Sequence, residues 1–541
     1  MKLATLMRDG WTGPWPPDPI EPDALHYDVP NECAWSRANL EESAPGVTTP
    51  MSWAFVAPST IISSRITFGL MGLMTEKELR APAPTTPDQV QTTLFYGRQS
   101  VNVDFFRRFI ARVPGADPDD FERDIFGFVN PRDEREASMM WRAPVVFANT
   151  LRNSRRLPEH LATLFDRTTA WWRESTTALA AMNLDETVEL FDQAKRRHAE
   201  VAGVHVFAFF LGQGHYARLT KKCVAADVEG LELTLSGGGS GTIEIEMIEG
   251  VEAIARGDST VEAFVERYGY RGPHEGEISA VSWREDSSPV EQMVELYRAD
   301  ARERAGDEDA AEALQRLLGG LALRQRIGTE RLVRRVQQYT QLRETGKAAF
   351  IACRDVGRAA SRRMGSLLAE ASRIDDPEDV FFLTPGDLGT ADDLRAIVDA
   401  RRTTWTEFDA LELPDHFVGI PEATAVVNAT SAAGPGDVIE GIGVSAGVIE
   451  GVARIVTNPA EFDGFEVGDI LVCELTDPAW APLMQLSAGL IIDIGGALSH
   501  GAIVARELGL PAIIGTGDGT KRIEDGQRVR IDGTAGTATI L

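Results

Sequence analysis

The spacing of apolar residues changes once along this chain, near residue 410, and this change constrains the fold more than any other feature. From about residue 85 up to that point, apolar residues recur at helical spacing through long stretches such as 157–182 and 184–211. Beyond it, short β-rich runs alternate with turns, as in 468–475 and 489–496. The sequence therefore predicts a multidomain α+β protein, with a large, mostly helical domain followed by a smaller β-rich one.

Local composition predicts the domain boundaries. Residues 411–437 are rich in Pro, Ala, Gly and Ser and lack a long amphipathic pattern, so we expect a linker there. Residues 1–410 precede it as the helical domain, and their first 60 or so, rich in proline and tryptophan, are expected to form an extended arm. Residues 438–541 are expected to form a compact β/β/α domain with one helix near 502–508.

The charge balance excludes some classes of partner. The chain carries 82 acidic and 54 basic residues, a formal net charge of -28. Such a surface repels nucleic acids and anionic membranes, so neither is expected to bind. The four cysteines form no C-x-x-C pair, and the most apolar short run, 204–212, is too short to cross a bilayer. We expect a cytoplasmic protein with reduced thiols and no metal site.

One histidine stands in a distinctive setting, GGALSHGAIVARELGLP at 495–511. Gly495 and Gly496 follow a predicted buried strand and allow close approach of a ligand to the backbone. Ser499 is placed to cap a helix that begins at His500, where free N–H groups and the helix dipole favour an anion. An exposed imidazole there can accept a phosphoryl group and pass it on. The alternative is a structural histidine.

The residues around His500 resemble a known domain. The stretch 475–515, from Thr476-Asp477-Pro478 through the glycine pair and Ser499 to Arg506, is similar to the swivelling phosphohistidine domain of phosphoenolpyruvate-utilising enzymes. This group includes pyruvate phosphate dikinase, phosphoenolpyruvate synthase and the rifampicin phosphotransferases. The resemblance continues through 524–541. It implies that 438–541 is a swivelling domain and that His500 becomes phosphorylated, supported by Gly495, Gly496, Ser499 and Arg506.

The helical part carries a looser resemblance. Stretches 33–55, 95–106, 268–290 and 371–388 are similar to the acceptor-substrate part of rifampicin phosphotransferases and phenylphosphate synthases. The sequence shows no (β/α)8 barrel, no ATP-grasp module and no Walker A pattern, and the glycine-rich run 236–250 reads as a loop capping a helix from about Thr242. The resemblance thus implies a separate ATP-grasp partner subunit that binds ATP and Mg²⁺. It also implies a small hydroxyl acceptor, such as a phenol or apolar alcohol.

A polar turn in the helical part supplies candidates for binding the acceptor and the phosphoryl group. Arginine clamps phosphoryl oxygens, and histidine or glutamate can take a hydroxyl proton. The turn departs from the family at Pro273-His274-Glu275, where relatives commonly show Gly-Glu. The alternative for the turn is a surface charge cluster or an internal salt bridge. For the two candidates outside the turn, the alternative is a role in packing or helix capping. The candidates are Arg271, His274, Glu275, Glu277, Arg98 and Asn102.

Two other functions stay open from the sequence. The chain could be a regulatory or binding homologue that keeps the fold without phosphorylation of His500. It could also be a ligase-like condensing enzyme, similar to the prodigiosin-condensing type, which activates one substrate by phosphorylation and joins it to another.

Overall fold

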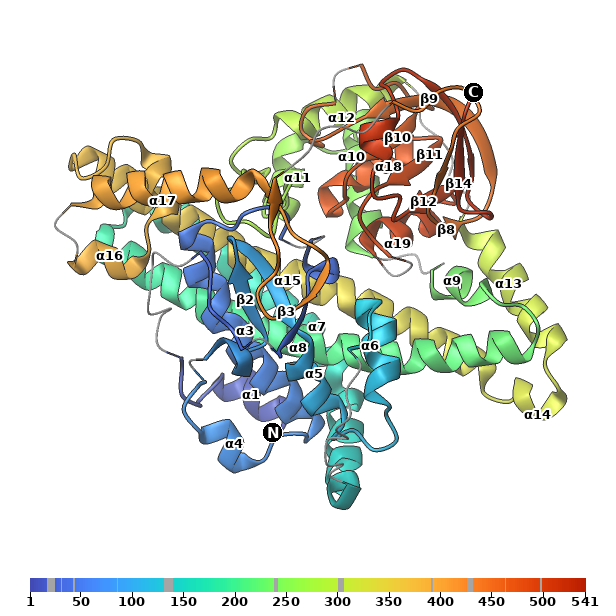
Figure 1. Ribbon diagram of the computed structural model, residues 1–541, viewed down its shortest axis with the longest axis horizontal. Helices are drawn as coiled ribbons and strands as arrows, with labels where there is room; N and C mark the ends of the chain where they lie inside the picture. The colour runs from blue at the N-terminus through green and yellow to red at the C-terminus, as the bar shows by residue number, and fades with distance from the viewer. Residues whose placement is uncertain are drawn as a thin grey trace. The chain divides into compact units, whose positions relative to one another are not determined.

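The computed structural model divides the chain into two compact units (Figure 1). The first comprises Met1–Ala208, His274–Ala280 and Thr345–Val427, and the second comprises Phe209–Pro273, Val281–Glu344 and Asn428–Leu541. The residues described are 1–16, 25–30, 32–41, 44–84, 86–130, 140–237, 242–299, 306–390, 393–425, 432–462, 464–496 and 499–541. Long helices followed by a β-rich C-terminal part confirm the predicted α+β class.

The first unit is built on long helices. They are α3 (Pro50–Met71), α7 (Ala143–Ala178), the start of α8 (Leu184–Ala225), the second half of α15 (Thr329–Glu370) and α17 (Leu394–Asp409). The predicted N-terminal arm is not an extended segment throughout, because α1 (Leu3–Asp9) and the start of α3 lie within it. Most residues of α3 are buried, so its sequence shows no polar face from which a helical period could be read.

Helix α3 is also the candidate for a membrane-spanning segment. Among the described residues it is the one helix long and apolar enough to cross a bilayer, and 83% of its most apolar window is buried inside the unit. Thr49 caps its start by accepting a hydrogen bond from the backbone N–H of Ser52, and Gly72 ends it in the left-handed conformation. A helix surrounded by protein on nearly all sides is typical of a core.

A four-stranded antiparallel sheet completes the first unit. Its order is β2 (Thr92–Phe95), β3 (Arg98–Asn102), β1 (Ala34–Ser36) and β5 (His416–Val418). Strand β5 comes from the segment predicted as linker. Phe417 is buried in the same cluster as Trp35 and Phe95, and its ring lies 5.0 Å from that of Phe95. Part of residues 411–437 is thus a structural strand, and residues 426–431 lie outside the described ones.

The second unit joins helices from the middle of the chain to the C-terminal sheet. Its helices include α9 (Leu231–Ser236), α10 (Ile243–Arg256), α11 (Val261–Tyr268), α12 (Ser288–Ala299) and α13 (Gly306–Gly320). Helices α10 and α12 pack on α18 (Ala481–Leu486), and the hydroxyl of Tyr297 donates to the carbonyl of Pro482 over 2.9 Å. The helical segment 1–410 is therefore divided between the units, because part of it buries its apolar faces against the β-rich part.

The C-terminal sheet has eight strands in the order β7-β14-β13-β9-β10-β11-β12-β8. Four central strands run parallel: β9 (Val448–Ile455), β10 (Ile470–Cys473), β11 (Gly489–Ile492) and β12 (Ala512–Ile514). The outer strands pair antiparallel: β7 (Val438–Glu440), β14 (Thr537–Ile540), β13 (Arg528–Asp532) and β8 (Ile442–Ser445). Each β-rich run in the sequence thus forms a strand. The strands β10, β11 and β12 are buried on both faces, as their unbroken apolar runs indicate.

Candidate functional site

His500 is the first residue of α19 (His500–Glu507), as predicted. Ser499 caps this helix, since its hydroxyl accepts a hydrogen bond from the backbone N–H of Ala502 over 3.3 Å. Gly495 adopts a φ of 145°, a backbone conformation that favours glycine over other residues. Residues 497 and 498 lie outside the described ones. The predicted sequence of strand, glycine turn, cap and helix is therefore present.

The turn before His500 is fixed by a residue that the sequence analysis missed. Asp493 lies just after β11 and is buried. Its carboxylate accepts hydrogen bonds from the hydroxyls of Thr516 and Thr520 and from the backbone N–H of Thr520. On the other side, a Cβ added at Gly501 would come within 2.6 Å of atoms of Ile492 and Thr476, so α19 packs very closely on its strand. Together these contacts position the start of α19.

The imidazole of His500 is buried, not exposed as the sequence led us to expect. The residue is only 7% exposed, because α19 begins against two helices of the same unit. Glu244, in the first turn of α10, and Glu344, on α15, each bring a carboxylate oxygen to it. One such oxygen from each glutamate and a ring nitrogen of His500 all lie within 4.8 Å of one another. Both glutamates are buried, at 2% and 3% exposure.

Arginines balance the buried carboxylates of this cluster. Arg271, fully buried, pairs with Glu244 over 3.3 Å, and Arg343 pairs with Glu344 over 3.0 Å. Burial lowers the pKa of Arg506 to about 10. Arg506, a predicted supporting residue, is half-buried, and its guanidinium donates to the carbonyl of Val444 over 3.5 Å. The surroundings of His500 are thus a dense set of opposite charges away from water.

Glu507, at the end of α19, is another buried acid beside this cluster. Burial, together with the nearby carboxylates of Glu244 and Glu344, raises the pKa of its carboxyl to about 8. The hydroxyl of Thr242, which also caps α10, donates to it over 3.2 Å and opposes the shift. Glu507 is therefore protonated at neutral pH, a state that spares the unit a third buried carboxylate.

No sequence motif pointed to Glu244, Glu344 or Glu507. Glutamates on amphipathic helices usually face solvent, as the half-exposed Glu246 does where it pairs with Arg267 over 2.6 Å. The one available hint was position. Glu244 shares its helix face with the buried Met247 and Ile248, three and four residues further on. Thr242 does cap α10, as predicted, and residues 238–241 of the glycine-rich run lie outside the described ones.

The polar turn 271–277 does not assemble as one group within a unit. Arg271 belongs to the second unit, whereas His274, Glu275 and Glu277 belong to the first. Glu275 is buried and lies 3.6 Å from the ammonium group of Lys347. His274 has a φ of 53°, and burial lowers the pKa of its imidazole.

Glu277 is the best-defined side chain of that turn. Its carboxylate accepts hydrogen bonds from the hydroxyls of Thr49, at 2.7 Å, and of Ser52 and Ser279. These contacts hold the carboxylate at the start of α3. The arrangement matches an internal capping role as well as a binding one.

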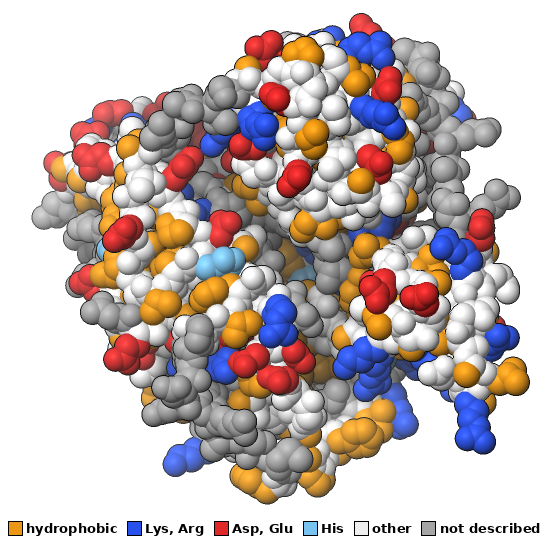
Figure 2. Space-filling model, turned by 45° about the vertical axis from the view of Figure 1, so that its right-hand side comes forward, with side chains coloured by type: hydrophobic (Ala, Val, Ile, Leu, Met, Phe, Trp, Pro, Cys, Tyr) orange, Lys and Arg blue, Asp and Glu red, His pale blue; other side chains and the backbone are white. Residues whose placement is uncertain are grey.

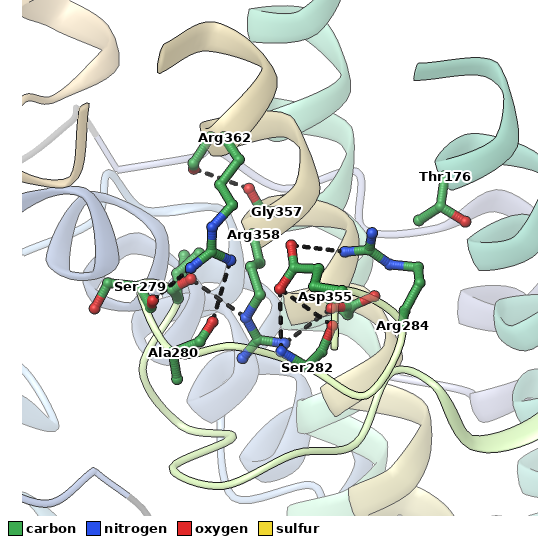
Figure 3. A network of polar contacts seen from close by, with 12 residues as sticks. Thr176, Ser279, Ala280, Ser282, Arg284, Asp355, Gly357, Arg358 and Arg362 are labelled. Carbon is green, nitrogen blue, oxygen red and sulfur yellow. Dashed lines mark hydrogen bonds and ion pairs between the residues drawn. The ribbon is translucent and has the colours of Figure 1, made fainter. Parts of the chain in front are cut away.

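Two arginines of α15 anchor the backbone at the end of this turn, and Figure 3 shows one of them, Arg362, beside Ser279 and Ala280. Arg358, itself paired with Asp355 over 2.9 Å, donates to the carbonyls of Glu277 and Ile278 over 3.1 and 3.3 Å. Arg362 donates to the carbonyls of Ser279 and Ala280 over 2.7 and 3.2 Å. These contacts fix the end of the turn to a long helix.

The last two candidates make structural contacts. Asn102 caps α5 (Val103–Ile110) by accepting from the backbone N–H of Phe105 over 2.9 Å. Arg98 donates to the carbonyl of Phe408 over 2.7 Å, at the end of α17. Both side chains therefore hold elements of the first unit together.

The comparisons with known proteins agree with the fold and the setting of His500. Residues 465–536 match the mobile domain of PEP-utilising enzymes, so the chain carries a domain of this class. Residues 228–344 match the fourth domain of rifampicin phosphotransferase. The resemblance to PEP-utilising enzymes and to rifampicin phosphotransferases is thus confirmed, the latter over a region that includes the stretch 268–290.

The relatives that this chain resembles are longer proteins. A rifampicin phosphotransferase from Streptomyces sviceus is 34% identical over 297 residues, which are 52% of this chain and 34% of that protein. The rifampicin phosphotransferase of Bacillus subtilis is 31% identical over 51% of this chain and 34% of its own length. This chain thus spans about a third of these relatives. A solved structure of Enzyme I aligns with 60% of this chain and 79% of its own, at 14% identity and a TM-score of 0.15.

Proposed function

We propose that this chain is the acceptor-side component of a dikinase-type phosphotransferase in which His500 carries the phosphoryl group. The observation that supports this most strongly is the match of residues 465–536 to the mobile domain of PEP-utilising enzymes, with His500 at the capped start of α19. Relatives in Streptomyces and Bacillus are named rifampicin phosphotransferases. In this proposal the chain works in the cytoplasm with a separate ATP-grasp subunit, which binds ATP and Mg²⁺.

The proposed chemistry has two transfers. A ring nitrogen of His500 attacks the β-phosphorus of ATP on the ATP-grasp partner, and AMP leaves as that P–O bond breaks. Water then cleaves the P–O bond between the β- and γ-phosphates, so inorganic phosphate leaves and one phosphoryl group stays on His500. The hydroxyl oxygen of a small acceptor then attacks the same phosphorus, the N–P bond breaks, and the hydroxyl proton leaves to a base. The net reaction converts ATP, water and the acceptor into AMP, inorganic phosphate and a phosphate ester. We infer a phenol or apolar alcohol as the acceptor.

Burial of His500 adds a requirement to this proposal. At 7% exposure, the imidazole reaches no external phosphoryl donor in the arrangement described. Phosphorylation would also place a dianion beside the carboxylates of Glu244 and Glu344, which is unfavourable in a site of low dielectric constant. The start of α19 must therefore separate from α10 and α15 before His500 is charged.

The test is turnover with an ATP-grasp protein from the same genome, ATP, Mg²⁺ and a panel of phenols and alcohols. We expect AMP release that depends on one acceptor and is abolished in His500→Ala. His215→Ala is the matched control, since His215 lies on α8 in the same unit, stacked on Tyr339, and should keep activity. Equal turnover in wild type and His500→Ala would refute the proposal, and a joined product in place of a phosphate ester would favour the condensing alternative.

One observation favours a second candidate, a regulatory or binding homologue. The buried cluster of His500, Glu244 and Glu344 would suit a histidine with a purely structural role. In that case phosphoryl transfer would not depend on residue 500, so replacing His500 would leave it unchanged. The second unit would nevertheless lose stability when the imidazole is removed.

A further inference from the structure

We infer that Glu244, Glu344 and His500 form a binding site for a divalent transition-metal ion, with Zn²⁺ as the favoured occupant. The three side chains come from three different helices of the second unit, α10, α15 and α19. Each offers one ligand atom, and these atoms lie within 4.8 Å of one another. All three residues are buried, so the protein would shield the bound ion from most of the solvent.

The donor set decides which ion fits. One imidazole nitrogen with two carboxylate oxygens suits Zn²⁺, Mn²⁺, Fe²⁺ or Co²⁺ and is poor for Ca²⁺, which needs six to eight oxygens. Tetrahedral bonds of about 2.0–2.1 Å to zinc place ligand atoms roughly 3.4 Å apart, so side-chain shifts of less than about 1 Å close the site. Three protein ligands leave a fourth position for water, as in many catalytic zinc sites.

Neighbouring arginines would orient the two carboxylates. Arg271 pairs with Glu244 over 3.3 Å through Oε1, and Arg343 pairs with Glu344 over 3.0 Å through Oε1. Ligating carboxylates are commonly held by such outer hydrogen bonds, which fix the direction of the second oxygen toward the metal. Both pairs are already made within the second unit, so the two glutamates are restrained before an ion arrives.

A bound ion would compete with phosphorylation, a consequence that rests on the proposed function. A ring nitrogen of His500 that coordinates a metal has no lone pair left for attack on phosphorus. The same ion would tie α19 to α10 and α15 and so oppose the separation that charging requires. The metal would thus act as an inhibitory clamp on the mobile domain.

The site itself is tested by titrating the full-length, metal-free protein with Zn²⁺ by calorimetry and with Co²⁺ by visible absorption. Neither measurement uses ATP or an acceptor, so a failure of the proposed function leaves the result unaffected. We expect one ion per chain, a higher melting temperature with Zn²⁺, and binding weaker by roughly 10-fold or more in Glu344→Gln and His500→Gln. Glu246→Gln is the matched control, because Glu246 lies on α10 but pairs with Arg267, and it should bind like wild type.

Circular dichroism separates loss of a ligand from loss of the fold. His500→Gln leaves both arginine–glutamate pairs intact. If Glu344→Gln is unfolded, metal binding by His500→Gln therefore tests the site. No saturable binding to the wild type, or equal binding by His500→Gln, would overturn the metal site. Labelling of His500 by phosphoramidate, a small phosphoryl donor, that is undiminished at saturating Zn²⁺ would overturn the clamp.

Discussion

At the scale of single residues, the most informative feature is a set of charged side chains packed away from water around His500. The sequence identified the histidine and its serine cap from their local pattern, which the structure retains. It did not identify Glu244, Glu344 or Glu507, because their proximity depends on how three helices meet. A local sequence pattern predicts where a helix begins and which residue caps it. It does not predict which carboxylates from distant parts of the chain will lie beside that helix.

Glu507 makes stability depend on pH. Its pKa is raised to about 8 in the folded protein, so between pH 5 and pH 8 the folded state holds a proton that the unfolded state has released. The free energy of unfolding should therefore fall as pH rises through this range, by on the order of 2–4 kcal/mol in total. Glu507→Gln should flatten the dependence. Urea denaturation of both proteins at pH 5, 6, 7 and 8 measures it, and parallel curves would show that the carboxyl is not perturbed.

At the scale of elements, the C-terminal strands were predictable and the first 60 residues were not. Buried parallel strands have a recognisable sequence pattern, a short unbroken run of apolar residues between turns. Residues 468–475 and 489–496 both show this pattern. Helix α3 is buried on nearly all sides, so it lacks the alternation of polar and apolar faces on which a prediction depends. Strand β5 was likewise hidden in a stretch rich in small residues, since only its pairing with β1 defines it.

The close packing of α19 on its strand predicts that Gly501→Ala is destabilising. The added methyl group would meet buried atoms of Ile492 and Thr476 at 2.6 Å. Overpacking of this kind costs about 1–3 kcal/mol, which should exceed the gain of about 1 kcal/mol in helix propensity. Gly214→Ala on α8 is the control, because a methyl group there has no atom within 4 Å and should stabilise slightly. Thermal unfolding compares the two, and equal melting temperatures would contradict the packing.

Removing the cap of α19 should have a smaller effect. Ser499→Ala loses the hydrogen bond to the backbone N–H of Ala502, at a cost of about 1 kcal/mol, whereas Ser499→Asp keeps an acceptor and should retain most of the stability. Chemical denaturation of the two variants gives the difference. An alanine variant as stable as the aspartate variant would show that the cap is not formed.

At the scale of the whole molecule, the chain divides into units that do not follow the predicted boundary at residue 410. Helices from the middle of the chain belong with the C-terminal sheet, which the period of the apolar pattern does not reveal, because a helix reads alike whichever core it joins. Acidic and basic side chains are interspersed on the face shown in Figure 2, and the whole chain carries a formal net charge of -28. Such a surface favours solubility and carries no information about the acceptor.

The proposed function depends on one event, the transfer of a phosphoryl group to the imidazole of His500, and mapping that modification is its sharpest test. The full-length chain, freed of transition metals, would be incubated with phosphoramidate, or with ATP, Mg²⁺ and an ATP-grasp protein, and then digested at alkaline pH for mass spectrometry. We predict one acid-labile phosphoryl group, on the peptide that contains His500, and none in His500→Ala. Phosphorylation at another residue, or an unmodified His500 under both conditions, would contradict the account.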